Sequence, residues 1–129
     1  MKYSDSVDRE AAFRLTKMIM KLFELWSLSL KEQSLMLDIS TKSTSTIASY
    51  KSGRTHIRLA RDRYDRVCYF LSIHKALKIL FPKNKVLAYS WPKARNRAFN
   101  DKTPIEVIVE DGYLGLHRVH SYLRNVLKQ

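Results

Sequence analysis

The amino-acid sequence predicts an all-α protein. Apolar residues recur at three- and four-residue steps through most of the chain, which is the spacing of one buried helix face. Only 3 Gly and 3 Pro occur among the 129 residues, so breaks are few, and roughly seven helices are expected. With 45% hydrophobic and 28% charged residues, the chain can bury one modest core or two small ones.

The first helix is predicted from Asp8 to Trp26, and residues 27–29 interrupt it. A second, short helix begins after Ser29, because Ser29 with Glu32 three residues later has the pattern of a capping box. It ends near Asp38. The expected buried side chains are Leu15, Met18, Ile19, Leu22, Leu25 and Trp26 in the first helix, and Leu30, Leu35 and Leu37 in the second.

Residues 40–53, STKSTSTIASYKSG, have the composition of a linker, and a surface loop is one interpretation of them. Ile47 and Tyr50, however, are spaced to dock one side of a helix, and Gly53 is a typical helix stop. We therefore expect a third helix here. Its start falls anywhere within residues 42–46, since Ser and Thr are indifferent helix formers.

A long helix is predicted from Arg58 to Phe81, ended by Pro82. More of its positions are apolar than one face can use within a monomer, so we expect a homodimer that forms along this helix. The main apolar stripe is Leu59, Val67, Phe70, Leu71, His74, Leu77 and Leu80, and the apolar positions outside it are Cys68, Tyr69, Ile73, Ala76 and Ile79.

Three further helices are expected in the last third of the chain. Asn84 caps a short helix that Pro92 ends. Thr103-Pro104-Ile105-Glu106 then combines a capping threonine, a proline in the first turn and a reciprocating glutamate. That helix stops at Gly112. A strand at residues 106–109 is the alternative, because this stretch is rich in β-branched residues, but the cap favours a helix. The last helix is marked by Leu116, Val119, Leu123 and Leu127.

A strong positive charge is the first indication of function. The chain has 24 Lys+Arg against 12 Asp+Glu, a formal net charge of +12. Nucleic acid or an acidic protein surface is therefore the favoured partner. The run from Lys75 to Arg97 is basic and contains no acid, although a solvated face that keeps the protein soluble is another interpretation of it.

A short helix, a turn and a second short helix, packed on a longer first helix, form a helix-turn-helix. Residues 1–58 are therefore expected to be a DNA-binding domain. Ser and Thr hydroxyls can meet phosphates or base edges, and nearby Lys and Arg can hold the DNA backbone. The expected DNA-contacting residues are Lys42, Ser43, Thr44, Ser45, Thr46, Ser49, Lys51, Arg54 and Arg58.

The second half has a series of residues in a familiar order, namely Arg66, Leu80-Phe81-Pro82, Trp91, Asn96, Phe99, Thr103-Pro104, Gly112, Val119 and Leu123. With these residues the stretch from Asp62 to Leu127 resembles the C-terminal toxin-binding domain of the Xre/MbcA/ParS antitoxins. The first half resembles the Xre-type helix-turn-helix of the same proteins. The chain departs from the family pattern at Pro92, where Leu is common, at Asn100-Asp101, where two Gly are common, and at Asp38, where the turn usually has Gly.

This resemblance implies an antitoxin that dimerises, represses its own operon through residues 1–58 and neutralises a cognate RES-domain toxin through residues 59–129. Toxins of that group degrade NAD or use it to ADP-ribosylate a target. The antitoxin itself needs no catalytic group and no cofactor. Two other interpretations are a stand-alone helix-turn-helix regulator without a toxin and a toxin-binding module with a vestigial DNA-binding domain. The expected toxin-contacting residues are Trp91, Arg95, Asn96, Arg97, Phe99, Arg118, Tyr122 and Arg124.

No pattern in the sequence indicates an enzyme or a metal site. A glycine-rich phosphate loop and a framed nucleophile are both missing. His117 and His120 lie three residues apart but have no third ligand at matching spacing. The lone Cys68 excludes an intrachain disulfide framework, and no apolar run approaches the roughly 20 residues that span a bilayer. We therefore expect a cytoplasmic protein with no membrane partner.

Overall fold

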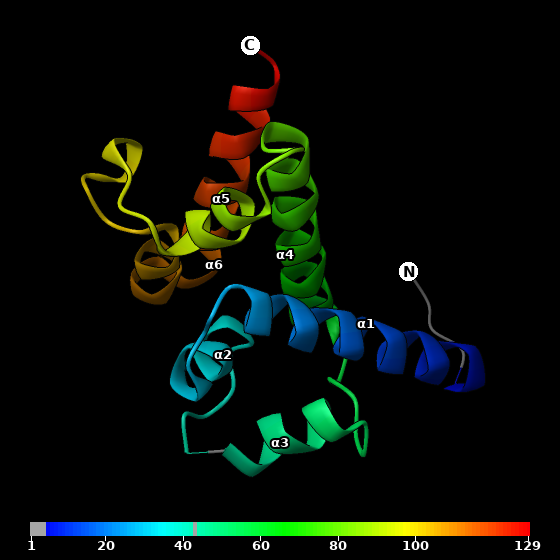
Figure 1. The fold of residues 1–129 in the computed structure, drawn as a ribbon. Coiled ribbons are helices and arrows are strands. Elements are labelled where there is room, and N and C mark those ends of the chain that lie inside the picture. Colours follow the sequence, from blue (N-terminus) through cyan, green and yellow to red (C-terminus); the bar gives the residue numbers. More distant parts are fainter. Residues whose placement is uncertain (1–4, 43) are drawn as a thin grey trace. The chain divides into compact units, whose positions relative to one another are not determined.

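The computed structural model describes residues 5–42 and 44–129, and most of these residues lie in helices (Figure 1). The all-α prediction is confirmed, since the described residues contain no strand and only an isolated bridge between Asn96 and Lys102. None of the described helices is long and apolar enough to cross a membrane. The helices are α1 (Asp5–Leu25), α2 (Leu30–Met36), α3 (Thr44–Ser52), α4 (Arg61–Leu80), α5 (Lys85–Ser90), the 3-10 helices η1 (Trp91–Lys93) and η2 (Arg97–Phe99), and α6 (Pro104–Leu127).

The chain divides into two compact units, Met1–Val67 and Cys68–Gln129. Helix α4 gives its first turns to the first unit and the remainder to the second. The division into functional domains between residues 58 and 59, before this helix, stays a prediction. Arg63 and Arg66 bond to the end of α2 and so tie the start of α4 to the first unit.

Helix α1 supplies much of the core of the first unit, on a face that is turned slightly from the predicted one. Ile19, Leu22 and Trp26 are buried as expected, but Met18 is 51% exposed. The buried face includes Thr16, whose hydroxyl donates to the carbonyl of Ala12 (2.7 Å) and accepts from the backbone N–H of Ile57 (2.8 Å). Hydrogen bonds thus let a polar residue occupy a core position.

Helix α2 begins at the predicted capping box. The Ser29 hydroxyl accepts from the backbone N–H of Glu32 (3.1 Å), and the Glu32 carboxylate accepts from the N–H of Ser29 (2.8 Å). The prediction for Leu30 was wrong, since its side chain is exposed. Gln33 fills the interior instead, where its side-chain amide donates to the carbonyl of Leu28 (3.0 Å).

In the second unit, Phe70, Ile73 and Leu77 of α4 are buried, together with apolar side chains of α6. Ile73, with 1% of its surface exposed, and Ala76 are therefore not free for a partner, contrary to the expectation from the sequence. When a helix packs on several neighbours, its buried face is wider than a single apolar stripe. A prediction that assumes one buried stripe therefore finds too few buried positions. The buried α6 residues are Ile105, Val107, Ile108, Leu116, Val119 and Leu123.

Helix α6 starts at the predicted capping box, in which Thr103 and Glu106 bond to one another's backbone N–H groups. Residues 106–109 are helical, as the cap indicated. Gly112 has φ +59° and ψ −132°, so the helix is broken there as predicted, and a second helical stretch follows. The turn at Gly112 brings Gly115 against the carbonyl of Val107, where a Cβ atom on Gly115 would lie only 2.3 Å from that oxygen.

Two short segments lie between α4 and α6. Asn84 caps α5 as predicted, because its side-chain oxygen accepts from the N–H of Leu87 (3.0 Å). Pro92 does not simply end this helix; it lies in η1, directly after it. In the loop that follows, Asn100 and Asp101 have φ values of +57° and +63°. Each therefore adopts the left-handed conformation that glycine adopts without steric cost.

Candidate functional site

The Ser/Thr-rich stretch forms a helix, and its apolar side docks as predicted. Ile47 and Tyr50 are buried, and α3 packs against both α1 and α2 (Figure 1). A linker would not need such a pair. Because both side chains are buried, they fix the rotation of α3 about its own axis. Because one face is held against the unit, the opposite face with its hydroxyl groups is turned to solvent.

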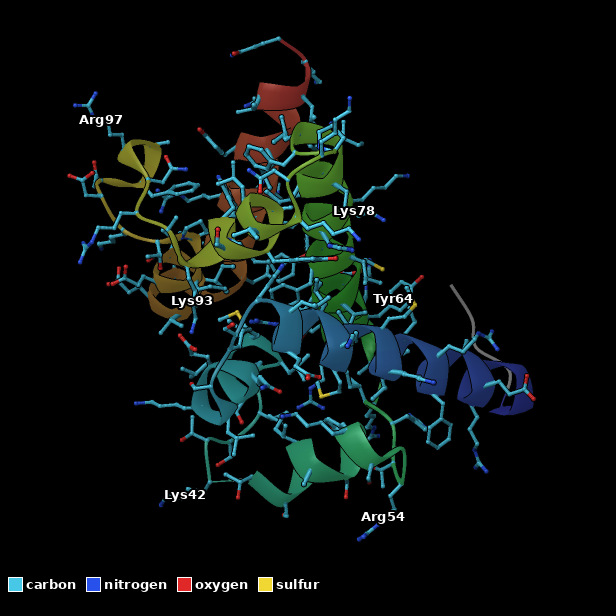
Figure 2. All side chains as sticks on the ribbon, viewed as in Figure 1. Lys42, Arg54, Tyr64, Lys78, Lys93 and Arg97 are labelled. Carbon is cyan, nitrogen blue, oxygen red and sulfur yellow. The ribbon has the colours of Figure 1, made fainter. Side chains whose placement is uncertain are left out.

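The predicted DNA-contacting residues lie along the exposed side of α3 and at both of its ends. Lys42 and Arg54 stand at opposite ends of the helix and point away from the first unit (Figure 2). Ser43 lies outside the described residues. Positive charge at two ends with hydroxyls between them suits a phosphate backbone on either side of a groove. Exposed members are Lys42, Thr44, Ser45, Lys51, Arg54 and Arg58, and half-buried members are Thr46 and Ser49.

The C-terminal end of α3 holds the following arginine in place. Gly53 has φ +78° and donates its N–H to the carbonyl of Tyr50 (3.3 Å), while Arg54 donates to the carbonyl of Ser49 (3.1 Å). These are the two bonds of a Schellman motif. The Ser52 hydroxyl also accepts from the N–H of Arg54 (3.4 Å). The backbone of Arg54 is thus fixed directly beyond the helix, and its side chain remains exposed.

Two arginines of α4 hold the turn between α2 and α3. Arg66, with only 8% of its surface exposed, donates to the carbonyl of Met36 (3.1 Å). Arg63 donates to the carbonyls of Leu37 (3.2 Å) and Asp38 (3.4 Å). These carbonyls end α2, where a helix attracts positive charge. Asp38 itself has φ +55°, the conformation that a glycine at this turn would supply.

A surface hollow beside α3 adds residues that the sequence analysis did not select. Its lining includes Phe13 and Lys17 of α1, with Tyr50, Lys51 and Thr55 on the other side. The Lys17 side chain therefore adds a positive charge next to that of Lys51. The only sequence signal for Lys17 was its place on the polar face of α1, which an ordinary solvated residue shares.

In the second unit, three of the predicted partner-contacting residues form one aromatic cluster. The rings of Trp91 and Tyr122 stack with centroids 6.2 Å apart, and Phe99 meets Tyr122 edge-on at 5.3 Å. Phe99 is buried, whereas the other two rings are half-buried. The Arg118 guanidinium lies 6.0 Å from the centre of the Phe99 ring and pairs with Asp111 at 2.9 Å.

The other predicted residues of this unit divide into those that build the loop and those that are free to contact a partner. Asn96 accepts from the N–H of Ala98 (2.9 Å), and Arg95 donates to the carbonyl of Asp101 (3.1 Å), so both hold the loop together. Arg97 points outward from that loop (Figure 2). Arg124 is also exposed, in the last turn of α6.

The acidic groups of the second unit are mostly bound by its own residues. The hydrogen bond with the Thr103 backbone lowers the pKa of Glu106, and the hydrogen bond with Glu110 raises the pKa of Lys102. Asp111 pairs with Arg118. The exposed Arg97 and Arg124 are not among the partners of these carboxylates.

The two histidines of α6 face an aromatic ring. The hydroxyl of Tyr69 and Nδ1 of His117 are 3.0 Å apart, and the Tyr69 and His120 rings meet edge-on at 5.0 Å. Burial lowers the pKa of His120, and the charges of Arg124 and His117 lower it further. No group of three or more His, Cys, Asp or Glu able to hold a metal occurs among the described residues.

No protein-family model, curated protein or solved structure matches the chain. The two surfaces themselves indicate what the chain can bind. One is a docked helix with exposed hydroxyls and cations, and the other is an aromatic cluster with exposed arginines. Both arrangements are suited to binding a macromolecule.

Proposed function

We propose that this chain is an antitoxin that binds DNA through α3 and neutralises a partner toxin through its second unit. The orientation of α3 carries the proposal most directly. Ile47 and Tyr50 fix the helix on α1 and α2, and the cations and hydroxyls are left on the side that faces solvent. A helix presented in this way has the size and polarity that the DNA major groove accepts.

In this proposal α2, the turn at Asp38 and α3 act as a helix-turn-helix. The hydroxyls of Thr44, Ser45 and Ser49 meet base edges or phosphates, and Lys42 and Lys51 contact the backbone. A homodimer would place two such helices on a two-fold operator. On α4 the candidates for that contact are now Ile79, which is exposed, and the half-buried Cys68 and Tyr69.

Because the sequence resembles the Xre/MbcA/ParS antitoxins, the partner that we propose is a RES-domain toxin that acts on NAD. Trp91 and Tyr122 supply the large, partly exposed surface that protein interfaces favour. The exposed Arg97 and Arg124 supply planar cations for an acidic site. The antitoxin acts by covering the toxin, so none of its own residues takes part in bond making.

Charge reversal at the exposed arginines tests the toxin half of the proposal. Arg97→Glu with Arg124→Glu should weaken co-purification with the toxin and lower inhibition of its NAD-consuming activity by at least about tenfold, since exposed arginines at the centre of an interface contribute about 1–2 kcal/mol or more each. Operator binding should not change. A Lys128→Glu variant, also exposed, is the control. Full inhibition by the double variant would exclude this surface.

A further inference from the structure

A group of four lysines in the second unit is used by neither surface described above. From Cys68 to Asn100 the sequence contains no Asp or Glu. Within this stretch, Lys75, Lys78, Lys83 and Lys85 are exposed, and none forms an ion pair within the described residues. We call these four residues the lysine patch.

The lysine patch spans the end of α4 and the start of α5. Lys75 and Lys78 lie one turn apart on α4, and Lys78 extends outward from that helix (Figure 2). Burial lowers the pKa of the His74 imidazole, and the charge of Lys78, four residues along α4, lowers it further. The His74 ring in turn stacks on Tyr89 of α5, with centroids 5.9 Å and planes 14° apart. The two helices that carry the patch are therefore joined beside it.

Lys78 lies in the last turn of α4, where a helix favours positive charge, but the local fold gives no such reason for Lys83 and Lys85. Lys83 and Lys85 flank Asn84 at the first turn of α5, where a helix disfavours positive charge, and no acid is present in that turn. Residues 82–87 are all exposed, so the patch is open to a large ligand. Like charges gathered in this way repel one another unless an anion binds between them.

Lysine chemistry favours a phosphate backbone over an acidic protein. Protein interfaces are enriched in Arg and depleted in Lys, and the arginines of this unit lie elsewhere, at Arg95, Arg97, Arg118 and Arg124. Lysine is instead a flexible point charge that meets phosphates without demanding one geometry.

An anionic membrane is a weaker fit. Val86 is 79% exposed and Leu87 is 40% exposed in the same segment, as a membrane contact would need. Helix α5, however, has only six residues, and interfacial helices bury a long apolar face in the lipid headgroups.

We propose that the lysine patch is a second nucleic-acid contact, which binds the phosphodiester backbone without regard to sequence. This contact is separate from α3 and does not require operator recognition.

The test compares two triple variants of the full chain with the same change in charge. The patch variant is Lys75→Gln, Lys83→Gln and Lys85→Gln, and the control is Arg9→Gln, Lys21→Gln and Lys128→Gln, all exposed positions. Binding to a random-sequence duplex is measured by fluorescence anisotropy over a series of salt concentrations. The patch variant should reduce the slope of log affinity against log salt by about 2 to 3, and should weaken binding roughly tenfold or more at low salt. The control variant should keep the salt slope and the affinity of the unaltered chain.

Equal behaviour of the two triple variants would overturn the proposal, whether both lose affinity or neither does. Loss of binding to phosphatidylserine vesicles with unchanged duplex binding would overturn it in favour of a membrane. Whether α3 binds DNA is tested separately, by the effect of Lys51→Ala in the unaltered chain and in the patch variant. If α3 does not bind DNA, Lys51→Ala has no effect, and the patch variant still loses affinity for the random duplex.

Discussion

The positively charged side chains of Arg63 and Arg66 bind backbone carbonyls of the protein itself. Both side chains end α2 by bonding to its last carbonyls, and they hold the turn that leads to α3. The sequence marked Arg66 only as part of a family pattern, because an arginine on a helix gives no sign of which carbonyl it will meet. Whether a side chain on a helix is exposed or buried depends on the rotation of the helix about its own axis. The packing of the whole unit sets that rotation.

Replacing the buried Arg66 should therefore destabilise the protein and loosen the turn that leads to α3. Arg66→Met removes the hydrogen bond to the Met36 carbonyl and leaves that oxygen buried, which should lower the free energy of unfolding by about 1–3 kcal/mol. Urea denaturation followed by circular dichroism measures this change. The control is Arg61→Met, at an exposed position in the same helix. Equal stability of the two variants would show that the Arg66 bond does not hold the turn.

A second residue-scale feature is the left-handed backbone at Asn100 and Asp101. The antitoxins that the sequence resembles commonly have two glycines at these positions. The positive φ values explain how this chain departs from that pattern and still forms the turn, since Asn and Asp adopt this conformation more readily than other residues.

Substitution at Asn100 tests this explanation. Asn100→Gly should be more stable than Asn100→Ala by about 1 kcal/mol, because alanine pays the steric cost of a positive φ and glycine does not. Thermal or urea unfolding of both variants gives the difference. A more stable alanine variant would mean that the loop does not hold Asn100 in this conformation in solution.

At the scale of elements, the two helical stretches of α6 meet through a glycine. The break at Gly112 lets the chain turn, and Gly115 then lies against the Val107 carbonyl with no room for a side chain. The break at Gly112 is predicted from the sequence, but the contact of Gly115 is not, because Gly115 falls in an apolar helical pattern where a small residue is unremarkable.

Gly115→Ala should therefore destabilise the second unit. A Cβ atom 2.3 Å from the Val107 oxygen forces the two stretches apart, and overpacking of this kind lowers the free energy of unfolding by about 1–3 kcal/mol. Leu114→Ala, at a neighbouring exposed position, should change it by less than about 0.5 kcal/mol. If both variants unfold at the same urea concentration, the contact is absent in solution.

The starts and ends of the elements could largely be predicted from the sequence, because caps and stops depend on neighbouring residues. Ser29 with Glu32 and Thr103 with Glu106 form their boxes, and Gly53 and Gly112 end their helices. The burial of particular side chains was less predictable. Met18 and Leu30 are exposed although the apolar spacing predicts that they are buried. Thr16 and Gln33 are buried, where hydrogen bonds to backbone groups stabilise them, and apolar spacing does not reveal such bonds.

The candidate site was predictable to a similar degree. Docking of α3 followed from Ile47 and Tyr50, since an i, i+3 pair on a helix must share a face. The hollow beside Lys17 and the stacking of Trp91 on Tyr122 join residues far apart in the sequence, and no local pattern specifies such pairs.

At the scale of the whole molecule, the chain is basic, and different groups of its cations serve different purposes. The charges of Arg63 and Arg66 stabilise the fold, those around α3 are proposed for DNA, and those of the second unit for a toxin and a phosphate backbone. The division of the chain into Met1–Val67 and Cys68–Gln129 allows each surface to be altered separately. Helix α4 is the element through which the two units are connected.

The most direct test of the central claim is the salt dependence of binding to the DNA upstream of the gene for this chain, measured for Lys42→Ala and Lys51→Ala with Lys21→Ala as the control. Each α3 variant should weaken binding to specific and random duplexes alike and should reduce the slope of log affinity against log salt by about 1, as expected for one lost phosphate contact. Affinities and slopes that equal those of the unaltered chain would contradict the claim that α3 contacts DNA.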